Sequence, residues 1–200
     1  ARNRGLSLAR GKYIIFLDSD DSFNERMLEL MYNKAVETNS DIVICSSVTI
    51  IDNEIDSYNR SIDKRLLPQK DVFNRKDFNW ILNFSQGQAW DKLYRRDFIV
   101  KNNIKFLNLK NTNDVYFTFL SLVLADKITT VDKKLVKYYF ENSNSLSKNR
   151  KKYPLCPLIA FYELKKNIEN RGLYKEIEQS YINALLRIIL YQTNSLEGNQ

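Results

Sequence analysis

Two short apolar runs separated by an amphipathic segment dominate the first quarter of the chain. Tyr13–Leu17 and Ile42–Cys45 are continuous apolar runs, typical of strands that are buried on both faces. Asn24 lies between them, where it can cap a helix. The apolar residues of that helix recur at helical spacing: Met27, Leu28, Met31, Tyr32 and Ala35. We therefore predict an α/β sheet in which the two runs form adjacent parallel strands.

The rest of the pattern alternates further helices with short strands. We predict helices over residues 1–10, 71–84, 96–102 and 114–125, strands over 89–94, 128–131 and 135–140, and a loop or edge hairpin over 50–67. Gly11 follows the first helix, where a left-handed cap belongs. The remainder is predicted to be helical and to pack through two apolar sets, which are Leu158, Ile159, Phe161, Tyr162 and Leu164, then Ile182, Ala184, Leu185, Leu186, Ile188, Ile189 and Leu190.

The composition narrows the chemistry that this chain can perform. It has no histidine, which excludes nucleophiles activated by imidazole and zinc sites built from histidine. Any catalysis must use carboxylates, hydroxyls, amines or a hard cation held by oxygen atoms. The two cysteines, Cys45 and Cys156, lie far apart in apolar segments, and we expect both to be reduced thiols of a cytoplasmic protein.

The charge balance indicates anionic partners. The formal net charge is +7 and the pI is about 9.3, which favours nucleic acid, phosphorylated sugars or an anionic membrane surface. The basic residues are scattered, and the densest cluster is short: Lys148, Arg150, Lys151 and Lys152. No stacking platform accompanies it, so we expect no nucleic-acid binding. No stretch is apolar over the length of a bilayer, and we expect at most peripheral association with the inner face of the cell membrane.

An acidic turn follows the first apolar run. Asp18, Asp20 and Asp21 lie at the carboxyl end of the predicted strand, where parallel α/β sheets bind ligands. Crowded carboxylates repel one another unless water or a cation compensates them. A hard divalent ion that also binds a diphosphate is one interpretation, and a solvated turn is the other. A calcium loop of the EF-hand kind is excluded, because Phe23 stands where that loop requires glycine.

Three blocks of residues carry a family pattern. Ala1–Asp21 reads ARNRGLSLARGKYIIFLDSDD, Ala89–Tyr94 reads AWDKLY and Asn113–Phe117 reads NDVYF. In this order they resemble the family-2 glycosyltransferases of the GT-A fold, whose blocks read ARNxGlxxAxGxYIxFLDSDD, xWxKLY and EDxxF. The resemblance implies a GT-A (Rossmann-like) mixed sheet flanked by helices over residues 1–145, followed by a C-terminal helical extension over 146–200. It also implies that the family's first strands, which hold the nucleobase, are missing ahead of Ala1.

The resemblance assigns roles to individual residues. Asp18 and Arg2 would contact the nucleotide sugar, Asp20 would bind Mn²⁺ or Mg²⁺, and Asp114 would be the general base. Trp90 and Lys92 would shape the acceptor side, which receives a glycan or a lipid-linked molecule. The implied reaction is transfer with inversion, in surface polysaccharide or glycoconjugate synthesis. Asp114 begins a predicted helix, and the helix dipole there favours the carboxylate.

Two residues depart from the family pattern, and the missing first strands, the net positive charge and the helical tail leave an alternative open. Asn113 replaces the usual Glu of the ED pair, and Phe140 stands where a basic residue is usual. Without the first strands, the fragment itself would be weakly active or inactive, and self-association would cover the open flank of its sheet. The alternative is a non-catalytic binding or scaffolding module derived from a glycosyltransferase.

Overall fold

The computed structural model describes residues 1–51, 54–56, 61–140 and 152–197. Its strands are β1 (Tyr13–Ile15), β2 (Ser22–Phe23), β3 (Ile42–Ile51), β4 (Glu54–Asp56), β5 (Val72–Phe73), β6 (Lys92–Arg95) and β7 (Ile128–Tyr139). Its helices are α1 (Arg2–Leu8), α2 (Met27–Thr38), the 3₁₀ turn η1 (Lys64–Leu66), α3 (Arg96–Lys101), α4 (Asn113–Leu124), α5 (Cys156–Asn170) and α6 (Tyr174–Glu197). The described strands form one sheet of order β1-β6-β3-β7-β2, with β4 paired to β3 and β5 paired to β7.

The two apolar runs share this sheet but are not neighbours, so the predicted adjacency is wrong. Strand β6 lies between β1 and β3 and is antiparallel to both, and its residue Tyr94 pairs with Ile14 on one side and Ile42 on the other. β1 and β3 therefore run in the same direction without touching. The parallel neighbour of β3 is β7. Strand β1 ends the strand order and buries only Ile14, so it is also not covered on both faces as predicted.

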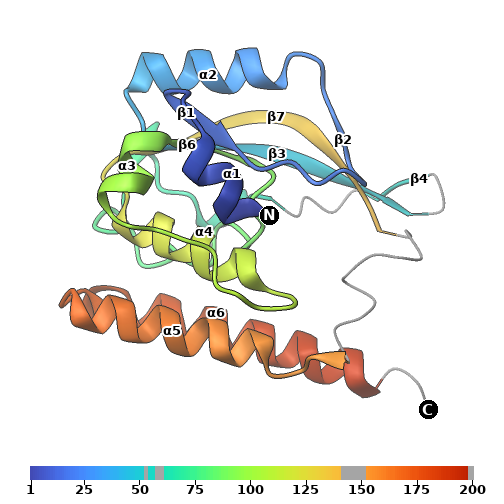
Figure 1. Ribbon diagram of the computed structural model, residues 1–200, viewed down its shortest axis with the longest axis vertical. Coiled ribbons are helices and arrows are strands. Elements are labelled where there is room, and N and C mark those ends of the chain that lie inside the picture. Colours follow the sequence, from blue (N-terminus) through green and yellow to red (C-terminus); the bar gives the residue numbers. More distant parts are fainter. Residues whose placement is uncertain (52–53, 57–60, 141–151, 198–200) are drawn as a thin grey trace.

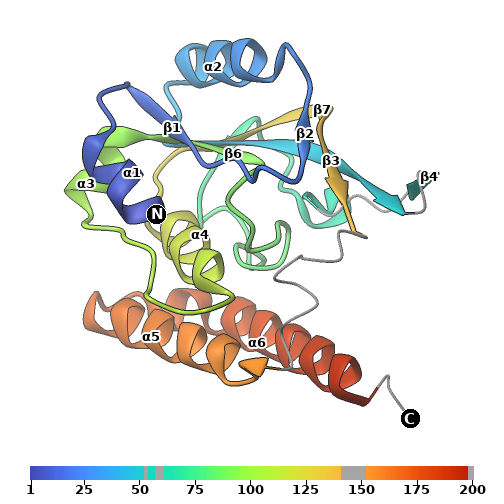
Figure 2. The same ribbon diagram turned by 45° about the vertical axis from the view of Figure 1, so that its right-hand side comes forward.

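The molecule is layered, with helices on both faces of the sheet (Figure 1). Helix α2 covers one face, while α4 lies against the other and separates the sheet from α5 and α6 (Figures 1 and 2). The central strand β3 contributes side chains to the cores on both faces of the sheet, because successive side chains of a strand point to opposite faces. Ile42 and Ile44 enter the core around α4, whereas Val43 and Cys45 enter the core around α2.

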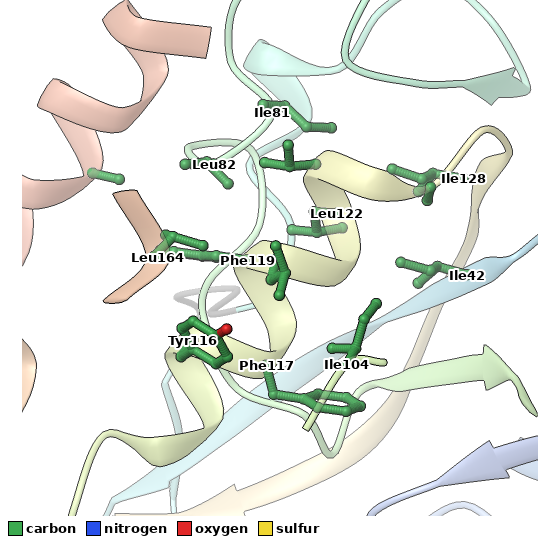
Figure 3. Packing of buried hydrophobic residues seen from close by; sticks show 14 of the residues in the cluster. Ile42, Ile81, Leu82, Ile104, Tyr116, Phe117, Phe119, Leu122, Ile128 and Leu164 are labelled. Carbon is green, nitrogen blue, oxygen red and sulfur yellow. The ribbon is translucent and has the colours of Figure 1, made fainter. Parts of the chain in front are cut away.

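Helix α4 is the centre of the larger core. Every residue from Tyr116 to Val123 is buried, because the sheet covers one side of the helix and α5 and α6 cover the other (Figure 3). Phe119, for example, meets Phe161 of α5 edge to face at a centroid distance of 5.9 Å. A helix that is apolar all round requires such a position between two layers. The predicted helical tail therefore shares one continuous core with the sheet.

Several local predictions need correction. Residues 71–84 contain β5 and turns rather than a helix. There the Asn74 N–H donates to the Asp77 carboxylate while the Asn74 side chain accepts from the Lys76 N–H, a local pattern that competes with helix formation. Gly11 is not a left-handed cap, since α1 ends at Ala9 in an extended conformation. The two strands predicted over 128–140 form the single strand β7.

Other predictions are confirmed. Residues 50–67 begin with the predicted edge hairpin, formed by β3 and β4, and both cysteines are buried free thiols. The predicted packing faces of three helices are only partly right. Of the predicted α2 stripe, Met27, Met31 and Ala35 are buried, whereas the other two residues are exposed. Of the two sets predicted to pack in the tail, Phe161, Leu164 and Ala184 are buried, but most members are exposed on α5 and α6, so the prediction is wrong for them: Leu158, Ile159, Tyr162, Ile182, Leu186, Ile189 and Leu190. The segment 141–145 and three members of the basic cluster, Lys148, Arg150 and Lys151, lie outside the described residues.

The core around α4 makes a first testable prediction. Phe117 is completely buried and contacts three other rings, so Phe117→Ala should reduce the free energy of unfolding by about 3–5 kcal/mol. Thermal unfolding followed by circular dichroism should show a lower melting temperature, by on the order of 10 °C. Leu8→Ala, at a position that is 60% exposed, is the control and should change stability by less than about 0.5 kcal/mol. Equal losses in the two variants would contradict this assignment of the core.

Candidate active site

An arginine near the start of the chain joins two elements that are far apart in sequence. The Arg2 Nη2 atom lies 2.7 Å from Oδ1 of Asp18, beyond the end of β1, and Nη1 donates to Oδ1 of Asn113, the first residue of α4, at 2.8 Å. The guanidinium also lies over the Phe106 ring, 5.5 Å from its centroid. Arg2 and Asp18 each remain about one-third exposed, so the pair stays open to solvent and to a ligand.

Aromatic contacts below this bridge explain why the two elements meet. Phe16 contacts Phe117 edge to face at 5.3 Å and Phe106 at 4.9 Å, and Phe106 stacks on Phe117 at 4.0 Å. Phe16 precedes Asp18 by two residues in an extended segment, while Phe117 follows Asp114 by three residues in a helix. A spacing of two in an extended segment and a spacing of three in a helix each put two side chains on the same side of the backbone. Phe16 therefore lies on the same side as Asp18, and Phe117 lies on the same side as Asp114. Packing of the rings therefore brings the two carboxylates toward each other.

The neighbouring Asn3 fixes α1 in place. Its side-chain amide donates to the Phe106 carbonyl at 2.8 Å and accepts from the Phe106 N–H at 2.9 Å. Helix α1 has no buried residue, so polar contacts hold much of it. Arg2 and Asn3 thus act together, because Asn3 anchors the helix from which Arg2 reaches Asp18.

Asp114 is partly buried in the first turn of α4. Its carboxylate accepts a hydrogen bond from the Val115 N–H at 3.0 Å. Burial raises the pKa of Asp114 above its usual value, while the positive charge of Arg2 lowers it and the negative charge of Asp18 raises it. The helix terminus was expected to favour the carboxylate, but burial outweighs this effect. A raised pKa makes a carboxylate a stronger base.

The acidic turn places its other carboxylates in different environments. Asp20 is exposed and has no hydrogen-bond or ion-pair partner among the residues that the structure describes. Asp21 is partly buried and accepts from the Tyr139 N–H at 3.3 Å. Burial raises the pKa of Asp21 to about 7, and the charges of Asp20 and Asp18 add to the increase. Within the described ranges, no group of three or more acidic or cysteine side chains could hold a metal ion by itself.

The predicted acceptor-side residues are buried. Trp90 is 6% exposed and stacks on Tyr138, with 5.8 Å between ring centroids. Lys92 is completely buried and forms an ion pair with the adjacent Asp91, from Nζ to Oδ1, at 2.7 Å. Lys92 therefore cannot contact a substrate without rearrangement. Lys92 can influence the acceptor side only by holding the backbone of the neighbouring residues 86–91.

The structure thus brings Arg2, Asp18 and Asp114 together, with Asp20 two residues away along the turn. Two contributions were not predicted from the sequence. Asn113 accepts from Arg2 as a glutamate could, and Asn3 anchors α1. The family's ARN block indicates that Asn3 matters. The partner of Asn3 is a backbone group more than one hundred residues away, which no local sequence pattern reveals.

The sequence of this chain was compared with families of known proteins. The sequence model of glycosyl transferase family 2 matches residues 1–101. The chain belongs to this family. The cholesterol galactosyltransferase of Borreliella burgdorferi is 30% identical over 96% of this chain and 54% of its own length. The poly(ribitol-phosphate) beta-N-acetylglucosaminyltransferase TarP of Staphylococcus aureus is 29% identical over 74% of this chain and 44% of its own length.

Solved structures show the same fold. The crystal structure of S. aureus TarS 1-349 in complex with UDP-GlcNAc superposes with a TM-score of 0.64 at 21% identity, over 84% of this chain and 46% of that chain. The described part of the family-2 chain therefore has the GT-A architecture, a mixed sheet flanked by helices. The chain spans about half the length of the curated relatives it matches. No described helix has both the length and the apolar character needed to cross a membrane.

The environment of Asp114 makes a second prediction, about stability and pH. Because its pKa is raised in the folded state, ionising Asp114 opposes folding as the pH rises above the unfolded value of about 4. The amide in Asp114→Asn cannot ionise, so this variant should melt at a higher temperature than the parent at pH 7. The difference should shrink toward pH 3, where Asp114 is protonated in both states. Thermal scans across this pH range measure it, and an unchanging difference would contradict the assigned environment.

Proposed function

We propose that the protein containing this chain transfers a sugar, with inversion, from a nucleotide-diphosphate sugar to an acceptor hydroxyl. The observation that carries this proposal is the Arg2 bridge, which holds Asp18 beside the first turn of α4 and its partly buried Asp114. The proposed nucleotide contact, Asp18, and the proposed base, Asp114, therefore lie on facing elements. The rings of Phe16 and Phe117 fix their separation.

Each residue has a definite part in the proposed reaction. Asp18 orients the nucleotide, and Arg2 provides positive charge for the diphosphate. Asp114 accepts the proton of the acceptor hydroxyl as that oxygen attacks the anomeric carbon. Attack on the face opposite to the leaving diphosphate inverts the configuration. The raised pKa of Asp114 suits this task, since proton transfer is most favourable when the base is not too weak.

A divalent cation fits the residues of the acidic turn when a diphosphate shares it. Mg²⁺ and Mn²⁺ bind carboxylate oxygens, and Mg²⁺ is commonly held by one or two carboxylates together with substrate phosphates. Asp20 offers an exposed carboxylate without a described partner, whereas Asp18 is already paired with Arg2. We therefore assign Asp20 as the ligand. When bound, the cation would stabilise the negative charge of the leaving nucleoside diphosphate.

The relatives support a substrate class for this proposal. The names of TarP and of the B. burgdorferi enzyme describe transfer of N-acetylglucosamine to poly(ribitol phosphate) and of galactose to cholesterol, respectively. TarS was solved with UDP-GlcNAc, so a uridine diphosphate sugar is the first donor to test. We propose a glycan or lipid-linked acceptor in surface polysaccharide or glycoconjugate synthesis. A cytoplasmic location and peripheral membrane contact stay predictions, as does self-association through the open flank of the sheet.

A third prediction concerns Asp20. In the complete enzyme, Asp20→Ala should remove most of the metal-dependent activity while the fold survives. UDP with Mn²⁺ should raise the melting temperature of the parent. When the UDP concentration is one hundred times its Kd, binding stabilises the folded state by about 2.7 kcal/mol. The melting temperature of the variant should rise far less. Glu25→Ala, which removes another exposed carboxylate of this region, is the matched control. Normal metal-dependent turnover by Asp20→Ala would show that a different residue holds the ion.

The same titration separates the enzyme from its alternative. A non-catalytic scaffold derived from a glycosyltransferase should not respond to UDP and Mn²⁺. The exposed Asp20 and the open Arg2–Asp18 pair favour a ligand-binding site over such a scaffold.

A fourth prediction concerns the base. Asn resembles Asp in shape and as a helix cap but cannot accept the proton, so Asp114→Asn should slow transfer by about a hundredfold or more. Steady-state rates of the complete enzyme at saturating donor measure this effect, and melting temperatures confirm that the variant is folded. Near-normal turnover would make Asp114 a helix cap and leave the base unassigned.

A further inference from the structure

A completely buried ammonium group organises the segment between Gln86 and Trp90. The Nζ atom of Lys92 donates to the Gln86 carbonyl at 3.1 Å, to the Gln88 carbonyl at 2.9 Å and to Oδ1 of Asp91 at 2.7 Å. An ammonium has three protons, and all three are used inside the protein. The chain from Gln86 to Asp91 is thereby wrapped around one positive charge.

The negative charge that pairs with Lys92 is the Asp91 carboxylate, and it too is held by hydrogen bonds. The second carboxylate oxygen of Asp91 accepts from the Gln88 side-chain amide at 3.1 Å, and the Ser61 hydroxyl also hydrogen-bonds this carboxylate. Ser61 in turn lies 2.8 Å from the Ser47 hydroxyl of β3, so the network reaches the central strand. Burial raises the pKa of Asp91, and the charge of Lys92 opposes this increase. Apolar residues often stabilise a core as well as a buried ion pair does, so stability alone does not explain this pair.

The wrapped segment lies against the helix turn that carries the base. Gly87 touches Val115, the residue after Asp114, so closely that a Cβ atom on Gly87 would lie 2.7 Å from Cγ2 of Val115 and 3.1 Å from its Cα atom. The Gln88 carbonyl accepts from the Thr118 hydroxyl at 3.4 Å, one turn further along α4. At the other end, Trp90 stacks on Tyr138 of β7. The segment therefore spans from α4 to β7 beside Asp114.

We propose that the Asp91–Lys92 pair is a positioning element that holds residues 86–90 against the first turn of α4 and so shapes the acceptor side of the site. The acceptor part rests on the proposed function, whereas the holding of the segment does not. An uncharged side chain in place of Lys92 could fill the same volume. It would remove the Lys92 hydrogen bonds to the Gln86 and Gln88 carbonyls. These carbonyls would keep the long contacts from Ser85 at 3.5 Å and Thr118 at 3.4 Å. The buried Asp91 carboxylate would also lose its counter-charge, and the segment would move away from α4.

The fifth prediction uses the fluorescence of Trp90. The chain has two tryptophans, so a Trp80→Phe background leaves Trp90 as the only one. In this background, Lys92→Met should increase acrylamide quenching of Trp90 by about threefold, as the ring passes from a buried to a solvated environment. Lys165→Met makes the same chemical change in an exposed ion pair of α5 and should leave the quenching unchanged. Circular dichroism establishes that each variant is folded.

Two outcomes decide the structural part. Parent-like quenching in folded Lys92→Met would overturn the proposal. If Lys92→Met does not fold, Asp91→Asn keeps the shape of the side chain but removes the charge that pairs with Lys92. Increased quenching in Asp91→Asn would then support the proposal, and parent-like quenching would overturn it.

Kinetics of the complete enzyme test the acceptor part. With a UDP-sugar and an acceptor that the parent enzyme uses, Lys92→Met should raise the KM for the acceptor by about tenfold, while thermal stabilisation by UDP and Mn²⁺ stays at the parent level. If Lys92→Met weakens acceptor use and UDP binding equally, the pair has a general structural role and the acceptor part of the proposal is overturned. If the parent enzyme transfers no sugar from any UDP-sugar to any glycan or lipid-linked acceptor, the proposed function is contradicted, and the fluorescence result stands independently.

Discussion

The contact between Phe16 and Phe117 is the constraint on which the candidate site depends. One ring comes from the extended segment after β1 and the other from α4, and one hundred residues of chain lie between them. Phe106 completes the group by stacking on Phe117 beneath the Arg2 guanidinium. Aromatic pairs of this kind contribute about 0.5–1.5 kcal/mol beyond the area they bury. Here the geometry matters more than the energy, because the same rings determine where Asp18 and Asp114 lie.

Above these rings, three carboxylates of one chemical type occupy three environments. Asp20 is exposed, Asp18 is neutralised by Arg2, and Asp114 is partly buried and has a raised pKa. In a protein without histidine, such differences in surroundings are the main means of giving acidic groups different tasks. Metal ligation, nucleotide contact and proton transfer can therefore be divided among residues that a composition table would count as identical.

The sequence predicted the elements better than their arrangement. Helices over 96–102 and 114–125 appear nearly as predicted, because their apolar patterns are local. The insertion of β6 between β1 and β3 was missed, since the pairing of Tyr94 with Ile14 joins segments eighty residues apart. The family resemblance identified Arg2, Asp18 and Asp114, and the structure brings them together. It could not reveal that Lys92 is buried, because lysine is rarely buried unless it is paired, and its partners here are backbone carbonyls and an adjacent aspartate.

The side chains of β3 alternate between the two cores, and this affects what determines the register of β3 with its neighbouring strands. A strand with one apolar face cannot slip by one residue without exposing that face. Residues 42–45 of β3 are apolar on both faces, so a slip there would exchange one set of apolar side chains for another. Polar contacts must then fix the alignment, and Asp41 is well placed to do so. Its carboxylate accepts from the backbone N–H groups of residues 126 and 127 and lies 3.3 Å from Arg95, so it locks β3 to both neighbouring strands at one end. The folding of this sheet thus depends on a charged residue just outside the strand, and hydrophobicity alone would leave its strands free to shift.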